Sequence, residues 1–277
     1  MKLPDGRTLP KIGFGTYLIP TFQTKDAVLE ALNVGYRLID TAAVYYNEET
    51  AAEGIAEFLR ENPQVPREDI IYTSKLWQSD FGDAAKQGVE QSLENAACIG
   101  AIDLYLLHSP LGGTQVRRTT WKALEDAVEA GKIKAIGVSN WSERHLNDLL
   151  EWDELRIKPV VNQIELSPWF QQNDLIRFCR ERNIAVEAYT PLTLGIKLED
   201  PMLVDLAKKY SKTPAQILLR YAIDRDTIPL PKSVRRNRIE ENFSVLDFAL
   251  ESSDLERLGD ANERLVTIPS WDPVTWE

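Results

Sequence analysis

Eight short apolar runs, separated by segments of helical periodicity, are the feature that most restricts the fold of this 277-residue chain. The runs are residues 11–15, 36–39, 70–73, 102–107, 133–138, 160–164, 184–188 and 227–230. Each run shows little alternation of apolar and polar residues, which is typical of parallel strands buried on both faces. Strands that alternate with helices predict either a (β/α)8 barrel or a doubly wound sheet.

The segments between the runs repeat apolar residues three and four positions apart, as amphipathic helices do. The spacing recurs in residues 52–59, 85–93, 121–128, 146–150 and 175–179. Thr213 followed by Pro214 predicts another helix start, because threonine caps free N–H groups and proline is tolerated in the first turn. Ahead of the first run, Asp5 and Gly6 lie between short extended pieces and predict a β-hairpin.

The composition is that of a globular protein, and it argues against several classes of function. The net charge of −11 disfavours a nucleic-acid-binding protein, which normally carries a basic excess. Two cysteines and two histidines supply neither a disulfide framework nor a zinc-ligand pattern, so we expect no metal site. We find no linker, secretion signal or long apolar run in the sequence. We therefore expect one domain over residues 1–277, cytoplasmic and without a membrane segment.

A polar residue ends each of the eight runs. In chain order these residues are Thr16, Asp40, Lys75, His108, Ser139 with Asn140, Gln163, Tyr189, and Lys232 with Ser233. Barrel enzymes build their sites at the carboxyl ends of several strands, whereas a doubly wound sheet gathers its site at a switch point. The distribution favours an α/β fold of the (β/α)8 TIM-barrel type, preceded by the N-terminal β-hairpin.

Asp40, Lys75 and His108 end neighbouring strands, so we expect them to converge, with Tyr45 on the loop after Asp40. Tyrosine is a poor acid at neutral pH, because its ordinary pKa is about 10. A lysine ammonium beside it lowers that pKa, and a buried lysine needs a carboxylate to remain charged. A histidine on the other side can donate a hydrogen bond to a carbonyl oxygen. The set contains no nucleophile–base pair, which argues against hydrolysis.

Each of these residues also has an ordinary explanation when it is considered alone. A single aspartate is usually a cap or a surface charge, a single lysine is usually solvated, and His108 follows an apolar run that suits a core position. Tyr46 is adjacent to Tyr45, and spacing does not decide between them. The residues that we interpret as structural, all in helical segments, are Cys98, Cys179 and His145.

Three segments carry a resemblance to a known family: residues 35–48 around Asp40 and Tyr45, residues 133–140, and residues 228–242. In residue types and spacing they resemble the three signatures of the aldo-keto reductases, and the resemblance spans nearly the whole chain. It is greatest to the short fungal and bacterial members, such as the 2,5-diketogluconate reductase-like group. The resemblance implies reduction of aldehydes and ketones to alcohols by a monomer or weak homo-oligomer that acts on small carbonyl substrates.

The resemblance implies that Asp40, Tyr45, Lys75 and His108 form the catalytic set. Tyr45, rather than Tyr46, matches the proton donor, and Lys75 matches the residue that lowers the pKa of the donor. Asp40 matches the carboxylate partner of the lysine, and His108 matches the histidine that orients the carbonyl group.

The resemblance also implies that the cofactor is NADPH. Ser139, Asn140 and Gln163 match residues that hold the nicotinamide carboxamide, and Tyr189 matches the ring that stacks on the nicotinamide. The other positions that match the cofactor site are Thr16, Asp40, Leu192, Lys232, Ser233, Val234, Arg238, Glu241 and Asn242. Of these, Lys232, Ser233 and Arg238 match the 2′-phosphate site, where a guanidinium can pair with phosphate through two hydrogen bonds.

For the substrate pocket the resemblance indicates Tyr17, Trp77 and Ser109. Ser109 follows His108 where many relatives carry a larger residue, so we expect that side of the pocket to be open. Trp141, Trp271 and Trp276 are equally consistent with pocket, core or surface positions. Gly13 and Gly15 lack the third glycine of a dinucleotide-binding fingerprint and belong to the first strand instead.

Two other functions remain open at this stage. A nicotinamide-sensing regulatory subunit would have the same fold and could retain the catalytic set. A barrel enzyme of sugar-phosphate metabolism would be active without a nicotinamide cofactor. Turnover of a simple aldehyde with NADPH distinguishes the reductase from both.

Overall fold

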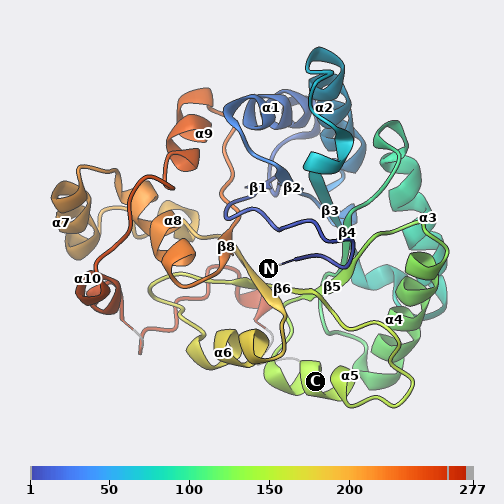
Figure 1. The fold of residues 1–277 in the computed structure, drawn as a ribbon. Coiled ribbons are helices and arrows are strands. Elements are labelled where there is room, and N and C mark those ends of the chain that lie inside the picture. Colours follow the sequence, from blue (N-terminus) through green and yellow to red (C-terminus); the bar gives the residue numbers. More distant parts are fainter. Residues whose placement is uncertain (1, 261, 273–277) are drawn as a thin grey trace.

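The computed structural model describes residues 2–260 and 262–272, and at its centre eight parallel strands follow one another in chain order (Figure 1). The strands are β1 (Phe14–Gly15), β2 (Leu38–Asp40), β3 (Ile71–Leu76), β4 (Leu104–Leu107), β5 (Ile136–Ser139), β6 (Val161–Glu165), β7 (Ala185–Tyr189) and β8 (Ile228–Pro229). Each of the eight predicted runs overlaps one strand. The predicted α/β barrel is confirmed.

Strands β8 and β1 close the ring through backbone hydrogen bonds. The amides of Gly13 and Gly15 donate to the carbonyl oxygens of Pro229 and Pro231, each at 3.0 Å. Proline has no N–H, so these two residues offer only acceptors to β1. In the two hydrogen bonds that close the barrel, the donors are therefore both on the β1 side.

Helices surround the ring (Figure 1). They are α1 (Thr21–Val34), α2 (Glu48–Glu61), α3 (Ala85–Asn95), α4 (Gly113–Glu129), α5 (Glu143–Leu150), α6 (Asn173–Glu181), α8 (Pro214–Asp224) and α9 (Arg236–Phe243). The predicted start of α8 is confirmed: Thr213 Oγ1 accepts from the amide of Gln216 at 3.2 Å, and Gln216 Oε1 accepts from the amide of Thr213 at 3.0 Å.

Two further helices depart from a strict alternation of strand and helix. α7 (Pro201–Tyr210) lies between β7 and α8, and α10 (Ser252–Arg257) follows α9. Leu203 of α7, Leu218 of α8 and Leu258 after α10 share a small hydrophobic core. Burial of this core holds the added helices on one side of the barrel.

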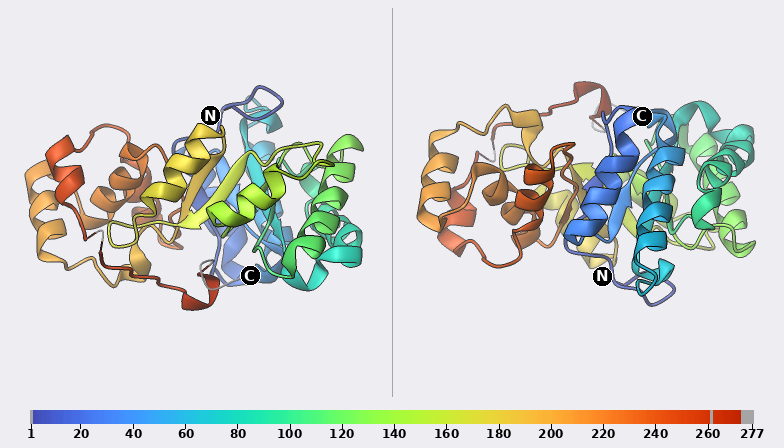
Figure 2. Two further views of the ribbon diagram at one scale, coloured as in Figure 1. Left: turned by 90° about the horizontal axis from the view of Figure 1, so that it is seen from below. Right: turned by 90° about the horizontal axis from the view of Figure 1, so that it is seen from above.

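The predicted N-terminal hairpin is present in its shortest form. One antiparallel bridge joins Lys2 and Thr8, and the turn contains Gly6 with a φ of 89°, which glycine adopts without strain. Leu3 and Leu9 belong to the hydrophobic cluster inside the barrel. Both views in Figure 2 show the hairpin (dark blue) at one end of the barrel and residues 262–272 (red) at the other.

The interior of the barrel changes from apolar to polar along the strands. The apolar layer nearest the hairpin includes Leu38, Ile71, Leu104, Val161, Ala185 and Ile228. Side chains two positions apart on a strand share a face. The residues two positions beyond Leu38, Val161 and Ala185 are Asp40, Gln163 and Glu187, and further along the inward faces lie Lys75 and His108. This change of layer places polar groups inside the barrel at its carboxyl end.

In the part of the chain that the structure describes, no helix combines the length and the apolar character needed to cross a membrane.

We expect Gly13→Ala to destabilise the barrel, because β1 approaches its neighbours closely there. An added Cβ would lie 1.9 Å from Leu38 Cδ2 and 2.6 Å from Leu230 Cδ2. Overpacking of this kind lowers the free energy of unfolding by about 1–3 kcal/mol, which urea denaturation measures. Leu38→Val removes the nearer atom. The double variant should therefore lose less unfolding free energy than the two single variants lose in total. Simple additivity would contradict the packing argument.

Candidate active site

A cavity of about 310 Å³ opens at the carboxyl end of the barrel. The predicted site residues that line it are Tyr17, Asp40, Tyr45, Gln163, Tyr189, Leu192, Lys232 and Arg238. They come from the ends of β1, β2, β6, β7 and β8 and from the segments that follow. The structure thus gathers residues far apart in the sequence around one space.

Asp40 and Lys75 form a buried ion pair below this cavity. Lys75 Nζ lies 2.7 Å from Asp40 Oδ1 and 2.8 Å from Oδ2, and it donates to the carbonyl oxygen of Thr41 at 2.8 Å. Lys75 has no exposed surface, and Asp40 is 4% exposed. A buried ammonium is stable only when its donors are satisfied, and these oxygens satisfy them. The predicted convergence of Asp40 and Lys75 is found in the structure.

Tyr45 ends the short 3-10 helix η1 (Ala43–Tyr45), directly above this ion pair. Lys75 Nζ lies 5.0 Å from the centre of the Tyr45 ring. The adjacent Tyr46 is 82% exposed and has a left-handed backbone, with a φ of 57°. Geometry therefore brings Tyr45, and not Tyr46, to the charged pair.

The pKa of Tyr45 differs from the expectation drawn from the sequence. Burial, followed by the nearby charge of Asp40, raises the pKa of Tyr45 well above its ordinary value. The prediction of a lowered pKa gave Asp40 only the role of keeping the lysine charged and took no account of the burial of Tyr45. In the structure Asp40 balances the charge of Lys75, so Tyr45 is next to a neutral pair and retains its proton.

His108 follows β4 and faces Tyr45 across the mouth of the barrel. Its ring lies 5.6 Å from the Tyr45 ring, 5.1 Å from Trp77 and 5.2 Å from Trp271, measured between ring centres. Burial, followed by the charge of Lys75, lowers the pKa of His108 well below its ordinary value. The imidazole is therefore neutral and carries one N–H donor.

Gln163 links two carboxyl groups across the interior of the barrel. Its Nε2 donates to Asp40 Oδ1 and to Glu187 Oε2, each at 2.8 Å. Strands β2 and β6 lie four places apart in the ring of eight, so the bond to Asp40 spans the barrel. Because both N–H groups of the amide are used, the group that Gln163 offers to the cavity is its amide oxygen.

Glu187 is a buried residue of this network that the sequence analysis did not identify. It has no exposed surface, and its Oε1 has no hydrogen-bond partner among the described residues. Burial, followed by the charge of Asp40, raises the pKa of Glu187 to about 7. The signal was one acidic residue inside an apolar strand run, residues 184–188.

Asn140 and Tyr189 are joined at the mouth of the barrel. Tyr189 Oη donates to Asn140 Oδ1 at 2.8 Å, and Asn140 Nδ2 donates to the carbonyl oxygen of His108 at 3.1 Å. Ser139 Oγ donates to the carbonyl oxygen of Gln163 at 3.0 Å. These bonds orient the Tyr189 ring, which lines the cavity.

The other end of the cavity is cationic. Lys232, after β8, and Arg238, in α9, line it, and neither has a carboxylate partner among the described residues. The neighbouring Arg236 differs, because it pairs with Glu30 at 3.2 Å and with Glu240 at 3.0 Å. Two cations without a carboxylate partner beside a cavity suit an anionic ligand.

Seven residues predicted for the cofactor site do not line this cavity in the structure: Thr16, Ser139, Asn140, Ser233, Val234, Glu241 and Asn242. Thr16 Oγ1 donates to the carbonyl oxygen of Asp40 at 3.0 Å, and Ser233 Oγ accepts from the amide of Arg235 at 3.0 Å. Glu241 Oε1 accepts from Thr213 Oγ1 at 2.8 Å. These polar groups bond within the protein at the ends of β1 and β8 and in α9.

Trp271 comes from the C-terminal segment and packs over the barrel mouth. Its ring lies 5.3 Å from Tyr17 and 6.0 Å from Tyr189. The amide of Thr267 donates to Glu165 Oε1 at the end of β6 at 2.8 Å, which ties the segment to the barrel. The sequence left pocket, core and surface positions open for Trp271, and the structure places it at the pocket.

Trp271 also borders a second hollow, of about 250 Å³, beside His108. Trp77 and Ser109, both predicted for the substrate pocket, line this hollow. Ser109 Oγ donates to Gln78 Oε1 at 3.1 Å.

The remaining candidates lie away from the cavity. Trp141 and Cys179 are fully buried, and His145 caps α5 through the amide of Ser142, which donates to His145 Nδ1 at 3.2 Å. Trp276 lies outside the described residues. Within residues 2–260 and 262–272, no three His, Cys, Asp or Glu residues form a group that could hold a metal ion.

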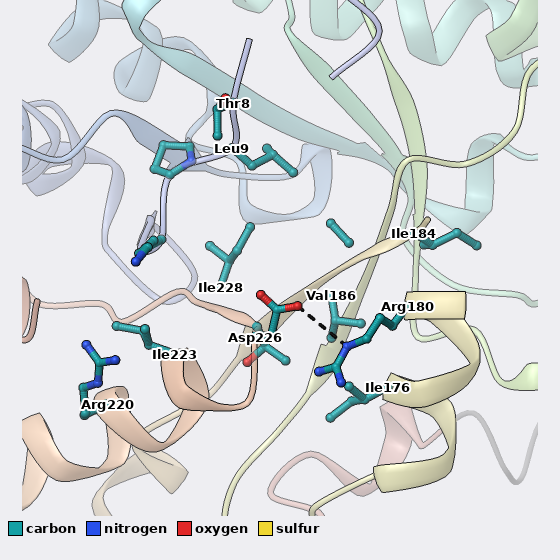
Figure 3. A pocket seen from close by; sticks show the side chains of 14 residues that line it. Thr8, Leu9, Ile176, Arg180, Ile184, Val186, Arg220, Ile223, Asp226 and Ile228 are labelled. Atoms are coloured by element: carbon teal, nitrogen blue, oxygen red, sulfur yellow. Dashed lines mark ion pairs between the residues drawn. The ribbon is translucent and has the colours of Figure 1, made fainter. Parts of the chain in front are cut away.

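A further cavity, of about 280 Å³, lies at the amino end of the barrel (Figure 3). Its lining combines apolar side chains with charged ones, among them Lys11, Arg180 and Arg220. Arg180 is 3.7 Å from Asp226, and Arg220 Nε donates to Asp224 Oδ1 at 2.9 Å. Asp226 and Asp224 thus pair with two of the cations that line this cavity.

Comparison with known proteins finds one family along most of the chain. A profile described as "Aldo/keto reductase family" matches residues 11–263. An uncharacterised oxidoreductase of Saccharomyces cerevisiae is 40% identical over 278 residues, covering 100% of this chain and 96% of the relative. A 9,11-endoperoxide prostaglandin H2 reductase of Trypanosoma cruzi is 39% identical over 259 residues, covering 92% of this chain and 88% of the relative.

Solved structures show the same fold. An aldo-keto reductase of Bombyx mori in complex with NADP superposes with a TM-score of 0.91 at 34% identity, covering 100% of this chain and 96% of that one. An aldo-keto reductase from a deep-sea metagenome library superposes with a TM-score of 0.87 at 37% identity, covering 96% of each chain.

We expect Glu187→Gln to change how stability depends on pH. The pKa of Glu187 is raised from 4.5 to about 7, so between these values the folded protein binds more protons than the unfolded chain. Wild-type stability therefore falls as pH rises through this window, and the variant escapes that loss. The stability of the variant relative to wild type should grow by about 2–3 kcal/mol between about pH 5 and pH 7.5.

Urea denaturation at a series of pH values measures this difference. Glu61→Gln, at an exposed glutamate, is the matched control and should show no such trend. A difference between Glu187→Gln and wild type that stays constant with pH would contradict the raised pKa.

Proposed function

This chain belongs to the aldo/keto reductase family, and we propose that it reduces aldehydes and ketones to alcohols with NADPH, Tyr45 being the proton donor. The observation that carries the proposal is the stack of three groups at the barrel mouth. The Asp40–Lys75 pair lies under Tyr45, with Lys75 Nζ 5.0 Å from the ring centre, and neutral His108 faces the same tyrosine. Such a set can bind and protonate a carbonyl oxygen.

His108 positions the carbonyl group in this proposal. Its neutral imidazole donates one hydrogen bond to the carbonyl oxygen, and Tyr45 donates another from the opposite side. A reduced nicotinamide, when bound, supplies the hydride that adds to the carbonyl carbon. Tyr45 then transfers its proton to the oxygen, which completes the alcohol.

Lys75 assists the proton transfer through its charge. As Tyr45 loses its proton, the phenolate gains an attraction to the ammonium that the neutral tyrosine did not have. Asp40 keeps that ammonium charged and fixed in place at 2.7 Å. The ammonium therefore attracts the phenolate that develops in the transition state and not the neutral tyrosine of the ground state, as catalysis requires.

The residues of the cavity fit a phosphorylated nicotinamide dinucleotide. At one end, the Gln163 amide oxygen can accept from a carboxamide, and the flat face of Tyr189 can contact a pyridine ring. At the other end, Lys232 and Arg238 can bind a phosphate. A cavity that offers an amide oxygen and an aromatic face at one end and two cations at the other suits NADPH.

The hollow beside His108 is our candidate for the substrate side chain. Trp77 and Trp271 supply its aromatic walls, and Ser109 with Gln78 supplies polar groups. Small carbonyl compounds with an apolar or aromatic substituent fit this lining.

We expect Tyr45→Phe to abolish carbonyl reduction while NADPH binding remains nearly intact. The substitution keeps the ring over Lys75 and removes only the proton that is transferred. Loss of a general acid lowers kcat by roughly 10²–10⁴-fold. The measurement is NADPH absorbance loss with a panel of aldehydes and ketones, alongside cofactor binding by fluorescence.

Tyr46→Phe is the matched control, because Tyr46 is the adjacent tyrosine and is exposed. It should turn over at the wild-type rate. Near-normal activity in Tyr45→Phe, or inactivity confined to Tyr46→Phe, would overturn the assignment. A wild-type protein that binds NADPH and reduces no carbonyl compound would favour a nicotinamide-sensing subunit instead.

We expect Arg238→Ala to raise the KM for NADPH about tenfold or more and to leave the KM for NADH nearly unchanged. A hydrogen bond to a charged group contributes about 1.5–3 kcal/mol, and only NADPH carries the 2′-phosphate. The control is Arg236→Ala, whose guanidinium already pairs with Glu30 and Glu240. Equal use of both cofactors by the wild-type protein would contradict a 2′-phosphate site at Arg238.

A further inference from the structure

Glu187 is a buried carboxyl group that the proposed reaction does not use. It lies on β7 in the interior of the barrel with no exposed surface. A lone buried carboxyl group is costly, and an apolar residue would fill this interior position at less cost. Its one hydrogen bond in the described structure is the one that it accepts from Gln163 Nε2 at 2.8 Å.

Two hydrogen bonds to acids on different strands hold the Gln163 amide. Asp40 of β2 and Glu187 of β7 each accept one N–H of the same nitrogen at 2.8 Å. A single bond to Asp40 would leave the amide free to rotate about that bond, whereas two bonds fix its plane. The amide oxygen, which has no partner among the described residues, is thereby held in one direction, and Gln163 lines the cavity.

We propose that Glu187 is a positioning residue which, together with Asp40, fixes the plane of the Gln163 amide so that its oxygen accepts a hydrogen bond from a primary carboxamide in the cavity. The inference rests on the proposed use of a nicotinamide cofactor. Glu187 touches neither cofactor nor substrate in this arrangement. It acts through Gln163, and its effect is selective for ligands that carry the carboxamide N–H.

The surroundings of Glu187 make this effect depend on pH. The charged groups that face it are Asp40 of β2 and Lys75 of β3, and Gln163 of β6 donates to it. On the neighbouring strand, Ile228 of β8 lies opposite and does not titrate. Since burial raises the pKa of Glu187 to about 7, the group ionises close to neutral pH. An ionised Glu187 is a stronger acceptor, so it polarises the Gln163 amide more and strengthens its oxygen as an acceptor.

The test compares three ligands that differ at the carboxamide. NADP⁺ carries the carboxamide, its acetylpyridine analogue replaces the amide nitrogen with a methyl group, and 2′-phospho-ADP-ribose lacks the pyridine ring. Dissociation constants are measured by calorimetry for the wild-type protein, Glu187→Leu, Glu187→Gln and Thr73→Val. Thr73 is the control for substitution inside the barrel, because it lies on the inward face of β3 and its buried hydroxyl has no partner among the described residues.

Wild type should prefer NADP⁺ over the acetylpyridine analogue by about tenfold, as one hydrogen bond allows. Glu187→Leu should lose most of this preference and bind 2′-phospho-ADP-ribose as wild type does. Thr73→Val should retain the preference. An unchanged preference in a folded Glu187→Leu protein, alongside wild-type turnover of carbonyl substrates, overturns the role of Glu187 and leaves the proposed function intact. A wild-type protein that binds none of the three ligands overturns the proposed function as well.

The Glu187→Gln variant keeps the proposal testable if Glu187→Leu does not fold. Its amide oxygen can still accept from Gln163, but it does not titrate. The wild-type preference for NADP⁺ over the acetylpyridine analogue should rise as pH increases through about 7. In Glu187→Gln the preference should be independent of pH. The same pH profile in both proteins would overturn the positioning role.

Discussion

The buried ion pair of Asp40 and Lys75 is the interaction on which the rest of the site depends. An ammonium with no exposed surface is stable inside a barrel only if oxygens surround it, and Asp40 with the carbonyl oxygen of Thr41 provides them. Tyr45 lies above the lysine, and Asp40 extends the network across the barrel to Gln163. Loss of either charge would leave its partner buried without compensation.

Much of this arrangement could be predicted because parallel strands bring their carboxyl ends together. The apolar runs located the strands, and the polar residues that end them located Asp40, Lys75 and His108 at one rim. What the sequence could not supply is contact across the ring. Gln163 and Asp40 are 123 positions apart and lie on opposite strands, and Glu187 meets them only because the barrel closes. A single acid in an apolar strand gives no indication of its partner.

Two other differences between the predictions from the sequence and the structure also arise from tertiary contacts. Tyr45 was predicted to have a lowered pKa from the proximity of a lysine, but the carboxylate of Asp40 balances that charge and burial then dominates. Trp271 reaches the pocket because Glu165 at the end of β6 holds the amide of Thr267. Neither the compensation of a charge nor the anchoring of a terminal segment can be read from local spacing.

The seam between β8 and β1 makes the barrel responsive to what it binds. Pro229 and Pro231 cannot donate to β1, so this edge is held by hydrogen bonds that the β1 side donates. Gly15 and Pro231, on the two sides of the seam, both line the main cavity. A molecule bound there would contact both edges and stabilise the closed barrel. The amide protons of Gly13 and Gly15 should therefore exchange with solvent more slowly when a ligand occupies the cavity.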